Sequence, residues 1–181
     1  QGEELMCWIG FDRSGEPVTA NSMRLLDLKG ATLKDEMESL RLFYGPNADA
    51  MRKTIDFQIT APYALLPQQQ IVYTGGFWVH PSMRGSGLSA VVPKISYYAA
   101  VAIWGVPVIL SIVRNVFLRP DISDIYNFEG AEPHFSFMTN GRMTWEGSLV
   151  WMTRPYLEGR IEQDIAKLIA SRSSADDRGG K

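Results

Sequence analysis

The sequence has very little cysteine and histidine. Its 181 residues include one cysteine, Cys7, which cannot form an internal disulfide, and two histidines, His80 and His134. These side chains are too few for a Cys/His zinc site, so we expect no metal. Scarce cysteine also favours a reducing compartment, and we therefore expect a cytoplasmic protein.

An excess of charge of either sign is also missing. The net charge is -2, so no bulk electrostatic field attracts nucleic acid, and we expect no nucleic-acid partner. Hydrophobic residues make up 45% of the chain and charged residues 21%, as in ordinary globular proteins. We expect one domain over residues 1–170 and a flexible, polar, glycine-rich tail over residues 171–181.

A stretch without charge from Ile95 to Val113 raises the question of a membrane span. Its length approaches the ~20 residues that cross a bilayer as a helix. Gly105-Val106-Pro107 interrupts it, however, and a proline breaks or kinks a continuing helix. The β-branched residues after the break are typical of a buried parallel strand. We therefore expect a helix followed by a strand, and no membrane partner.

Alternating apolar residues and turn signals predict antiparallel hairpins near both ends of the chain. The first turn, Asp12–Glu16, consists of residues that turns prefer. The second contains Asn140-Gly141, and Asn-Gly is the strongest short hairpin signal. The predicted strands are Leu5–Phe11, Val18–Leu28, Ile71–Val79, Val106–Val113, His134–Asn140 and Met143–Arg154.

Apolar residues at helical spacing predict the helices. Thr32 is a suitable N-cap with acidic residues in the turn after it. Met51, Ile55 and Ile59 are spaced four apart and indicate a second helix. We expect the apolar face of the C-terminal helix to pack on the domain or on a second copy of the chain, as a homodimer. The predicted helices are Thr32–Leu42, Asp49–Ile59, Ala90–Trp104, a segment from Asp121 to Glu129, and Arg160–Ala170.

The segment Ile71–Val113 joins a strand, a glycine-rich turn, a helix and a second strand. The turn, Arg84-Gly85-Ser86-Gly87, comes directly before the helix. Free N–H groups at a helix N-terminus can hold a phosphate, and glycines let the backbone approach it closely. The turn matches neither the dinucleotide fingerprint nor a Walker-type loop. By itself it indicates either an anion site or a tight strand-to-helix turn.

In its context this turn resembles the acyl-CoA signature of the GNAT acyltransferase superfamily. There a strand with an apolar end precedes an Arg/Gln-x-x-Gly-x-Gly/Ala loop whose amides wrap the CoA pyrophosphate. Val79–Leu88 follows that pattern, with Arg84 and Gly87 on its first and second fixed positions. Ser89 stands where glycine or alanine is usual, a mild departure.

A second correspondence to the same superfamily lies further along the chain. The family often has an asparagine after its fifth strand, as Asn115 does here. It also has a tyrosine shortly before a glycine, and Tyr126 and Gly130 match that spacing. The resemblance implies an α/β, GNAT-like acyl-CoA N-acyltransferase fold. That fold has a mixed central sheet with a splayed pair of parallel strands, flanked by helices.

The resemblance further implies transfer of an acetyl group from acetyl-CoA, or of another acyl-CoA's acyl group, to a primary amine. The amine attacks the thioester directly, and Tyr126 is the implied general acid that protonates the leaving thiolate. The other interpretation of Tyr126 is an ordinary core aromatic. The implied CoA-binding residues are Trp78, Val79, Arg84, Gly85, Ser86, Gly87, Leu88, Ser89 and Asn115.

The acceptor side stays open at this level. His80 is expected at the pyrophosphate end rather than at the thioester, and the general base could be Tyr73, Thr74, Glu129 or Glu132. Trp145 and Phe137 could line an acceptor pocket, although we favour core packing for both.

Two departures from the family pattern concern whole segments. The strand and two helices that usually precede the hairpin are absent, and Thr32–Ile59 is inserted where a short turn is usual. The substrate wall could therefore be rebuilt, either from the inserted segment or from an N-terminal region that is missing from this chain. The alternative function is a degenerate GNAT-fold protein that binds CoA, or only a partner, without catalysis.

Overall fold

Seven strands form one sheet in the computed structural model, which describes residues 4–119, 125–126 and 128–176. The order across the sheet is β1-β2-β4-β5-β7-β6-β3. One neighbouring pair, β4 and β5, is parallel and the others are antiparallel. The strands are β1 (Glu4–Phe11), β2 (Pro17–Asp27), β3 (Ile55–Ile59), β4 (Gln70–Val79), β5 (Val108–Arg114), β6 (Gly130–Thr139) and β7 (Arg142–Thr153).

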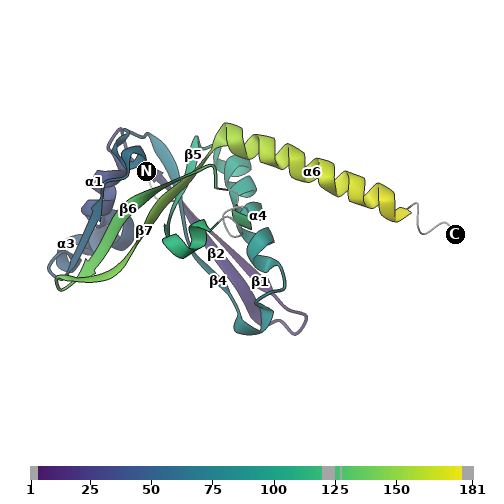
Figure 1. Ribbon diagram of the computed structural model, residues 1–181, viewed down its shortest axis with the longest axis horizontal. Helices are drawn as coiled ribbons and strands as arrows, with labels where there is room; N and C mark the ends of the chain where they lie inside the picture. The colour runs from purple at the N-terminus through teal and green to yellow at the C-terminus, as the bar shows by residue number, and fades with distance from the viewer. Residues whose placement is uncertain (1–3, 120–124, 127, 177–181) are drawn as a thin grey trace.

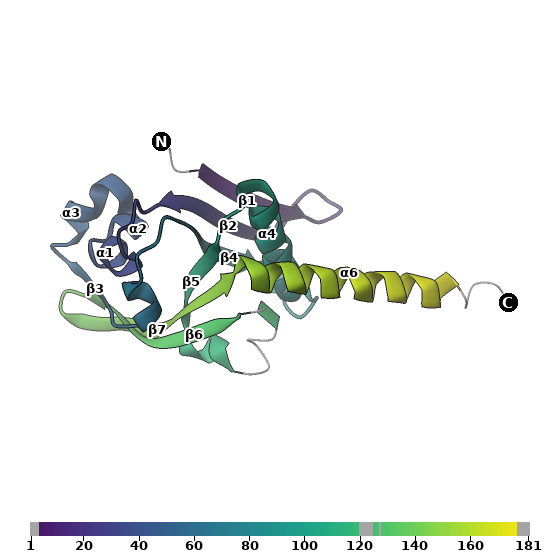
Figure 2. The same cartoon turned by 90° about the horizontal axis from the view of Figure 1, so that it is seen from above.

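Helices cover both faces of this sheet (Figures 1 and 2). Short helices gather on one side, and a longer helix packs with the start of the C-terminal helix on the other. The helices are α1 (Leu33–Glu38), α2 (Arg41–Tyr44), α3 (Ala48–Met51), α4 (Leu88–Trp104) and α6 (Arg154–Asp176). The 3-10 turns are η1 (Gly45–Asn47), η2 (Pro62–Leu65), η3 (Pro81–Met83) and η4 (Asn115–Leu118).

The core is divided by the sheet into two apolar clusters. Residues of β3, β6, α1 and α2 pack around Phe57 and Leu40 on one face. Residues of β4, α4 and α6 pack around Tyr97 and Leu157 on the other. Since apolar area buried on both faces stabilises a sheet, the central strands β4 and β5 are held from both sides.

Both predicted hairpins are confirmed. β1 and β2 pair in an antiparallel register, as do β6 and β7. At the second turn Asn140 and Gly141 have φ of 50° and 71°. Positive φ at both central residues is the geometry that matches the twist of a two-residue hairpin.

The charge-free stretch is a helix followed by a strand, as expected. α4 ends at Trp104, where Gly105 adopts a left-handed φ of 59° and caps it, and β5 starts at Val108. Within the ranges that the structure describes, no helix is both long and apolar enough to cross a membrane.

The helix expected over Asp49–Ile59 is wrong. α3 ends at Met51, and Ile55–Ile59 forms edge strand β3, with Ile55, Phe57 and Ile59 buried and the residues between them exposed. The spacing of four between Ile55 and Ile59 fits a strand as well as a helix, because four is also a multiple of two. Pairing with β6 decides in favour of the strand.

The helix expected over Thr32–Leu42 is interrupted. Leu40 lies at a left-handed φ of 64°, and this turn separates α1 from α2. Its side chain is fully buried, so burial offsets the cost of a conformation that leucine rarely adopts.

The C-terminal helix is longer than expected at both ends. It begins at Arg154, and Pro155 fits its first turn because that turn needs no intrahelical N–H. It continues to Asp176, beyond the expected start of the tail at Ser171, and projects away from the sheet in Figure 1. The predicted cap Asp121 lies outside the described residues.

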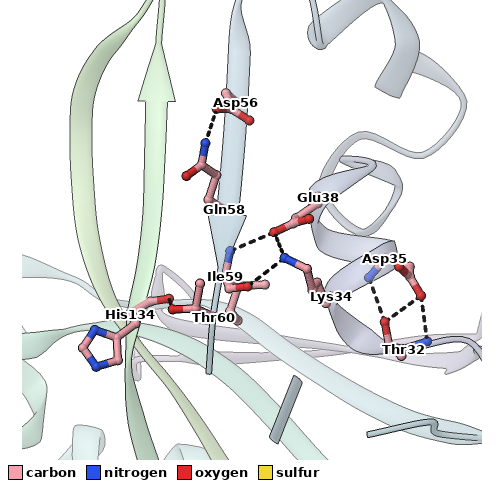
Figure 3. Close-up of polar contacts among 9 residues, drawn as sticks. All are labelled: Thr32, Lys34, Asp35, Glu38, Asp56, Gln58, Ile59, Thr60 and His134. Atoms are coloured by element: carbon pink, nitrogen blue, oxygen red, sulfur yellow. Dashed lines mark hydrogen bonds and ion pairs between the residues drawn. The ribbon is translucent and has the colours of Figure 1, made fainter. Parts of the chain in front are cut away.

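A polar cluster ties α1 to the end of β3 (Figure 3). The Glu38 carboxylate accepts hydrogen bonds from the Lys34 ammonium and, at 3.2 Å, from the backbone N–H of Ile59. Lys34 Nζ also donates to the Ile59 carbonyl at 3.0 Å. At the other end of α1, Thr32 and Asp35 form a reciprocal capping box. The side chain of Glu38 therefore links the inserted helices to the sheet edge.

We expect Glu38→Ala to lower the free energy of unfolding by about 1–3 kcal/mol, because the Ile59 N–H loses its acceptor. The control is Glu158→Ala, which removes the exposed i,i+4 pair with Arg154. That change should cost only about 0–1 kcal/mol. Urea unfolding of both variants checks the difference, and equal losses would contradict the role given to Glu38.

Candidate active site

β4 and β5 part after a short stretch of pairing. Their parallel register covers Val72 with Ile109 and Tyr73 with Leu110. One residue further on, Ser111 Oγ donates to the Thr74 carbonyl at 2.9 Å. Beyond this point a cavity of about 360 Å³ opens between the strands. The predicted splayed parallel pair is therefore confirmed.

A β-bulge accounts for the divergence. Ser22 pairs with Gly75 and Ala20 with Trp78, so one residue of β2, Asn21, lies opposite both Gly76 and Phe77 of β4. Gly76 has a φ of 68°, which a residue with a side chain rarely adopts. Because a bulge bends its strand, β4 stays paired with β2 while its outer half leaves β5.

Residues from several elements line this donor cavity, as we call the space between β4 and β5. Pro93 and Tyr97 come from α4, while Arg114 and Phe117 lie at and just beyond the end of β5. The remaining wall comes from β2, β4, β5, β7 and the segment before β6. These residues are Asn21, Thr74, Gly75, Gly76, Phe77, Ser111, Ile112, Val113, Tyr126, Phe128 and Trp145.

Tyr126, the predicted general acid, lies in the wall of the donor cavity. Its ring stacks on Phe128 at 5.7 Å and meets Phe77 and Phe117 edge-on. Burial raises the pKa of its hydroxyl above the usual value, so the group is protonated at neutral pH. Tyr97 is fully covered beside it, and burial, then the neighbouring Tyr126 hydroxyl, raise the pKa of Tyr97 too. The cavity thus contains phenols that can donate but do not ionise near neutral pH.

The glycine turn presents free backbone N–H groups. Gly85 and Gly87 have φ of 83° and 87°, and Gly87 is the N-cap of α4 without a side-chain cap. Among the described residues, no acceptor meets the N–H groups of Gly87, Leu88 and Ser89. Unpaired N–H groups at the positive end of the α4 dipole are able to hold an anion.

The strand end before this turn has one open backbone edge. His80 N donates to the Val18 carbonyl at 2.8 Å, and the Trp78 carbonyl accepts from Thr19 Oγ1 at 2.9 Å. Since successive residues of a strand direct their polar groups to opposite sides, the N–H and C=O of Val79 point away from β2. Trp78 faces β2 with its backbone, and its exposed ring lies edge-on to His80.

Asn115, the remaining predicted CoA contact, lies outside the lining of the donor cavity. Its Oδ1 accepts a hydrogen bond from Ser148 Oγ at 2.7 Å, which fixes η4 on strand β7. Ser148 is fully buried, so this bond satisfies a hydroxyl inside the sheet.

The candidate bases are not gathered at one place. Glu129 accepts from the N–H of Thr153 at 2.6 Å and Glu132 from that of Tyr63 at 2.7 Å, and neither lines the donor cavity. His80 is exposed and bonds Ser82. Thr74 lines the donor cavity and Tyr73 a second cavity on the opposite face of the sheet.

That second cavity measures about 510 Å³ and lies towards the inserted helices. It shares Gly75, Gly76, Ile112 and Trp145 with the donor cavity. Phe137 and Trp145 line it and also pack against the core, so both interpretations of these residues hold.

The sequence analysis missed Asn21 and Tyr97. Asn21 is buried in the wall opposite the bulge, and its Nδ2 has no hydrogen-bond partner among the described residues. A sequence signal existed, because Asn21 shares the inward phase of β2 with Thr19 and Met23, where an amide is out of place. Tyr97 had no such signal, since an aromatic on a helix usually means core.

Within the described ranges, no group of three or more His, Cys, Asp or Glu side chains could hold a metal ion.

No model of a known protein family and no curated protein sequence matches this chain. Solved structures are similar at low identity. Aminoglycoside acetyltransferase AAC(6')-Ib, in complex with coenzyme A and kanamycin, is 14% identical with a TM-score of 0.45, over 85% of this chain and 69% of that one. A polyamine N-acetyltransferase of Drosophila melanogaster is 10% identical with a TM-score of 0.49, over 81% and 74%.

A chimera of Vibrio cholerae spermidine N-acetyltransferase SpeG with hSSAT is 10% identical with a TM-score of 0.45, over 84% of this chain and 69% of that one. Likenesses at this level carry no argument about the residues or the chemistry of this chain.

We expect Tyr97→Phe to reduce the decrease in the free energy of unfolding at high pH. The pKa of Tyr97 in the folded state lies above its unfolded value of about 10. Its contribution to the free energy of unfolding is therefore complete below pH ~10 and is lost as the pH rises towards the folded pKa. The wild type should lose about 1.4 kcal/mol more per pH unit than the variant in that window. Urea unfolding of both proteins near neutral pH and at about pH 11 measures this difference. Equal losses of unfolding free energy in the two proteins would contradict a raised pKa of Tyr97.

Proposed function

We propose that this chain is an acyl-CoA-dependent N-acyltransferase that moves an acetyl group from acetyl-CoA to a primary amine. The observation that carries the proposal is that helix α4 starts at an uncapped glycine turn and, further along, lines a cavity between diverging parallel strands. A diphosphate and a long, narrow thioester arm need those features side by side.

The chain's own groups suit the parts of acetyl-CoA in order. Unpaired N–H groups at Gly87, Leu88 and Ser89, with Arg84 beside them, would receive the pyrophosphate. The open edge of Val79 would pair with the amides of the pantetheine arm as an added strand does. The acyl end would then lie in the donor cavity.

The proposed reaction is direct attack of the amine nitrogen on the thioester carbonyl. A C–N bond forms, the C–S bond breaks, and the thiolate takes a proton. Tyr126 is the proposed donor of that proton, supported by its position in the cavity wall and by the raised pKa of its hydroxyl. The proton of the attacking amine leaves to solvent; the hydroxyls of Thr74 and Tyr73, which border the two cavities, are protonated and could only relay it by giving up their own proton.

A second candidate is a CoA-binding protein without turnover. It is favoured by the positions of Glu129 and Glu132, whose carboxylates are engaged by backbone N–H groups instead of facing the cavity. A homodimer and a cytoplasmic location stay predictions from the sequence.

We expect Gly87→Ala to weaken acetyl-CoA binding at least tenfold, because a methyl group disfavours the left-handed backbone that exposes the N–H groups. Gly15→Ala is a matched control: Gly15 has the same φ of 87° and the same open surroundings, but it lies in the β1–β2 turn. Calorimetric titration with acetyl-CoA compares the two. Equal weakening, or no binding by the wild type, would contradict the anion site.

We expect Tyr126→Phe to lower kcat about 100-fold while the Kd of acetyl-CoA changes little, because only the proton donor is lost. Since the acid must be protonated and its pKa is raised, activity of the wild type should not fall through Tyr126 ionisation below pH ~10. Thiol release with a panel of amines measures both quantities. Binding without turnover, and no effect of this change, would support the second candidate.

A further inference from the structure

Asn21 places a buried amide in the wall of the donor cavity. Its side chain is 1% exposed, and its Nδ2 has no hydrogen-bond partner among the described residues. Most buried polar side chains in folded proteins are hydrogen-bonded, and an unsatisfied donor lowers the stability of the chain that carries it. A ligand that brings an acceptor into the cavity would explain why an amide stands at this position.

Polar groups close to Asn21 are already used within the sheet. Thr19, which occupies the same phase of β2, donates through Oγ1 to the Trp78 carbonyl at 2.9 Å. Ser111 Oγ donates to the Thr74 carbonyl at 2.9 Å. These hydroxyls hold strands together, whereas the Asn21 amide is left for a molecule inside the cavity.

The bulge sets the level at which this amide lies. Asn21 is opposite both Gly76 and Phe77 of β4, beyond the short stretch in which β4 pairs with β5. Met23, the next residue of the same phase, packs in the core cluster on the α4 side of the sheet. Asn21 therefore belongs to the α4 side, on which helix α4 also lines the donor cavity.

The part of the ligand at this level is its acyl end. With the pyrophosphate at the glycine turn and the pantetheine arm along Val79, the acyl group extends furthest into the cavity, beside Phe77. Phe77 also meets the Tyr126 ring edge-on at 6.3 Å, so the amide of Asn21 and the phenol of Tyr126 flank the same residue. A neutral N–H donor suits a carbonyl oxygen, and it stabilises that oxygen most when negative charge develops on it in a buried site.

We propose that Asn21 is a catalytic residue of the acyltransfer, and that its Nδ2–H donates a hydrogen bond to the thioester carbonyl oxygen. This rests on the proposed function. As the amine nitrogen attacks, the C–N bond forms and the π electrons of the carbonyl move onto the oxygen. Asn21 stabilises this oxyanion without giving up its proton. The carbonyl forms again when the C–S bond breaks, and the thiolate takes its proton from Tyr126.

The first test replaces the amide by an apolar side chain of similar shape, in Asn21→Leu. We expect kcat to fall about 100-fold, the usual effect of removing one donor to an oxyanion. Asn21→Ala removes the same donor without adding bulk to the cavity wall, so its kcat should fall equally. Thiol release with a panel of amines measures both variants, and a kcat within about twofold of the wild type in both overturns the proposal.

Thermal unfolding of the ligand-free chain separates this role from a structural one. Asn21→Leu should unfold at the temperature of the wild type or above it, because the lost donor has no partner among the described residues. The matched control is Thr19→Val, which removes a buried hydroxyl that has a partner and should unfold at a lower temperature. A decrease for Asn21→Leu as large as that for Thr19→Val means that the amide is structural, and overturns the proposal.

The second test compares acetyl-CoA with the thioether S-ethyl-CoA, which has a CH₂ group in place of the thioester carbonyl. The wild type should bind acetyl-CoA about fivefold more tightly, the effect of one net hydrogen bond. Asn21→Leu and Asn21→Ala should bind the two alike. Thr19→Val should keep the wild-type ratio, because Thr19 lines neither cavity. Calorimetric titration measures the ratios, and a wild-type ratio in both Asn21 variants refutes the contact with the carbonyl.

The proposed function and this inference fail in different ways. If the wild type transfers the acetyl group and both Asn21 variants do so equally fast, the acyltransferase stands and the role of Asn21 is wrong. If the wild type binds neither acetyl-CoA nor S-ethyl-CoA, both are wrong.

Discussion

The whole arrangement depends on the parting of β4 from β5. A parallel pair is normally closed by regular hydrogen bonds, and here only Val72 and Tyr73 of β4 keep partners in β5. The bulge at Gly76 bends β4 while its pairing with β2 continues, so the sheet opens without exposing a free strand. β5 in turn stays paired along its length with β7. The opening is thus held rigidly from both sides.

The start of α4 also leaves backbone N–H donors without acceptors among the described residues. A serine or aspartate at the start of α4 would cap its N-terminus and contribute about 1 kcal/mol, but Gly87 stands there. Pro93, further along α4, removes one intrahelical N–H and lines the cavity instead. Without a side-chain N-cap and without the N–H that Pro93 lacks, α4 is less stable locally than it could be. The buried side chains of Tyr97, Ala100 and Val101 hold it on the sheet.

The parts that could be predicted from sequence are those in which neighbouring residues decide the structure. The two hairpins, the turn of Gly85 and Gly87 and the break at Gly105 follow from local chemistry. The strand Ile55–Ile59 and the turn at Leu40 could not be predicted, because pairing with β6 and burial of the Leu40 side chain are long-range effects. The second cavity could not be predicted from the sequence either, since its aromatic rings come from four separate elements.

Glycine at positions 75 and 76 explains why the two cavities can act as one site. A side chain at Gly75 would contact the Tyr73 ring, and one at Gly76 would approach Ser22 Oγ to 3.1 Å in an unfavourable backbone conformation. Without side chains, the wall between the cavities at this point is only the backbone of β4. A donor reaching the gap between β4 and β5 from the α4 side and an acceptor reaching it from the α2 side would meet beside that backbone, where Gly75, Gly76 and Ile112 line both cavities. The same bulge that opens the sheet would therefore also bring the two proposed ligands within reach of each other, whatever the identity of the amine.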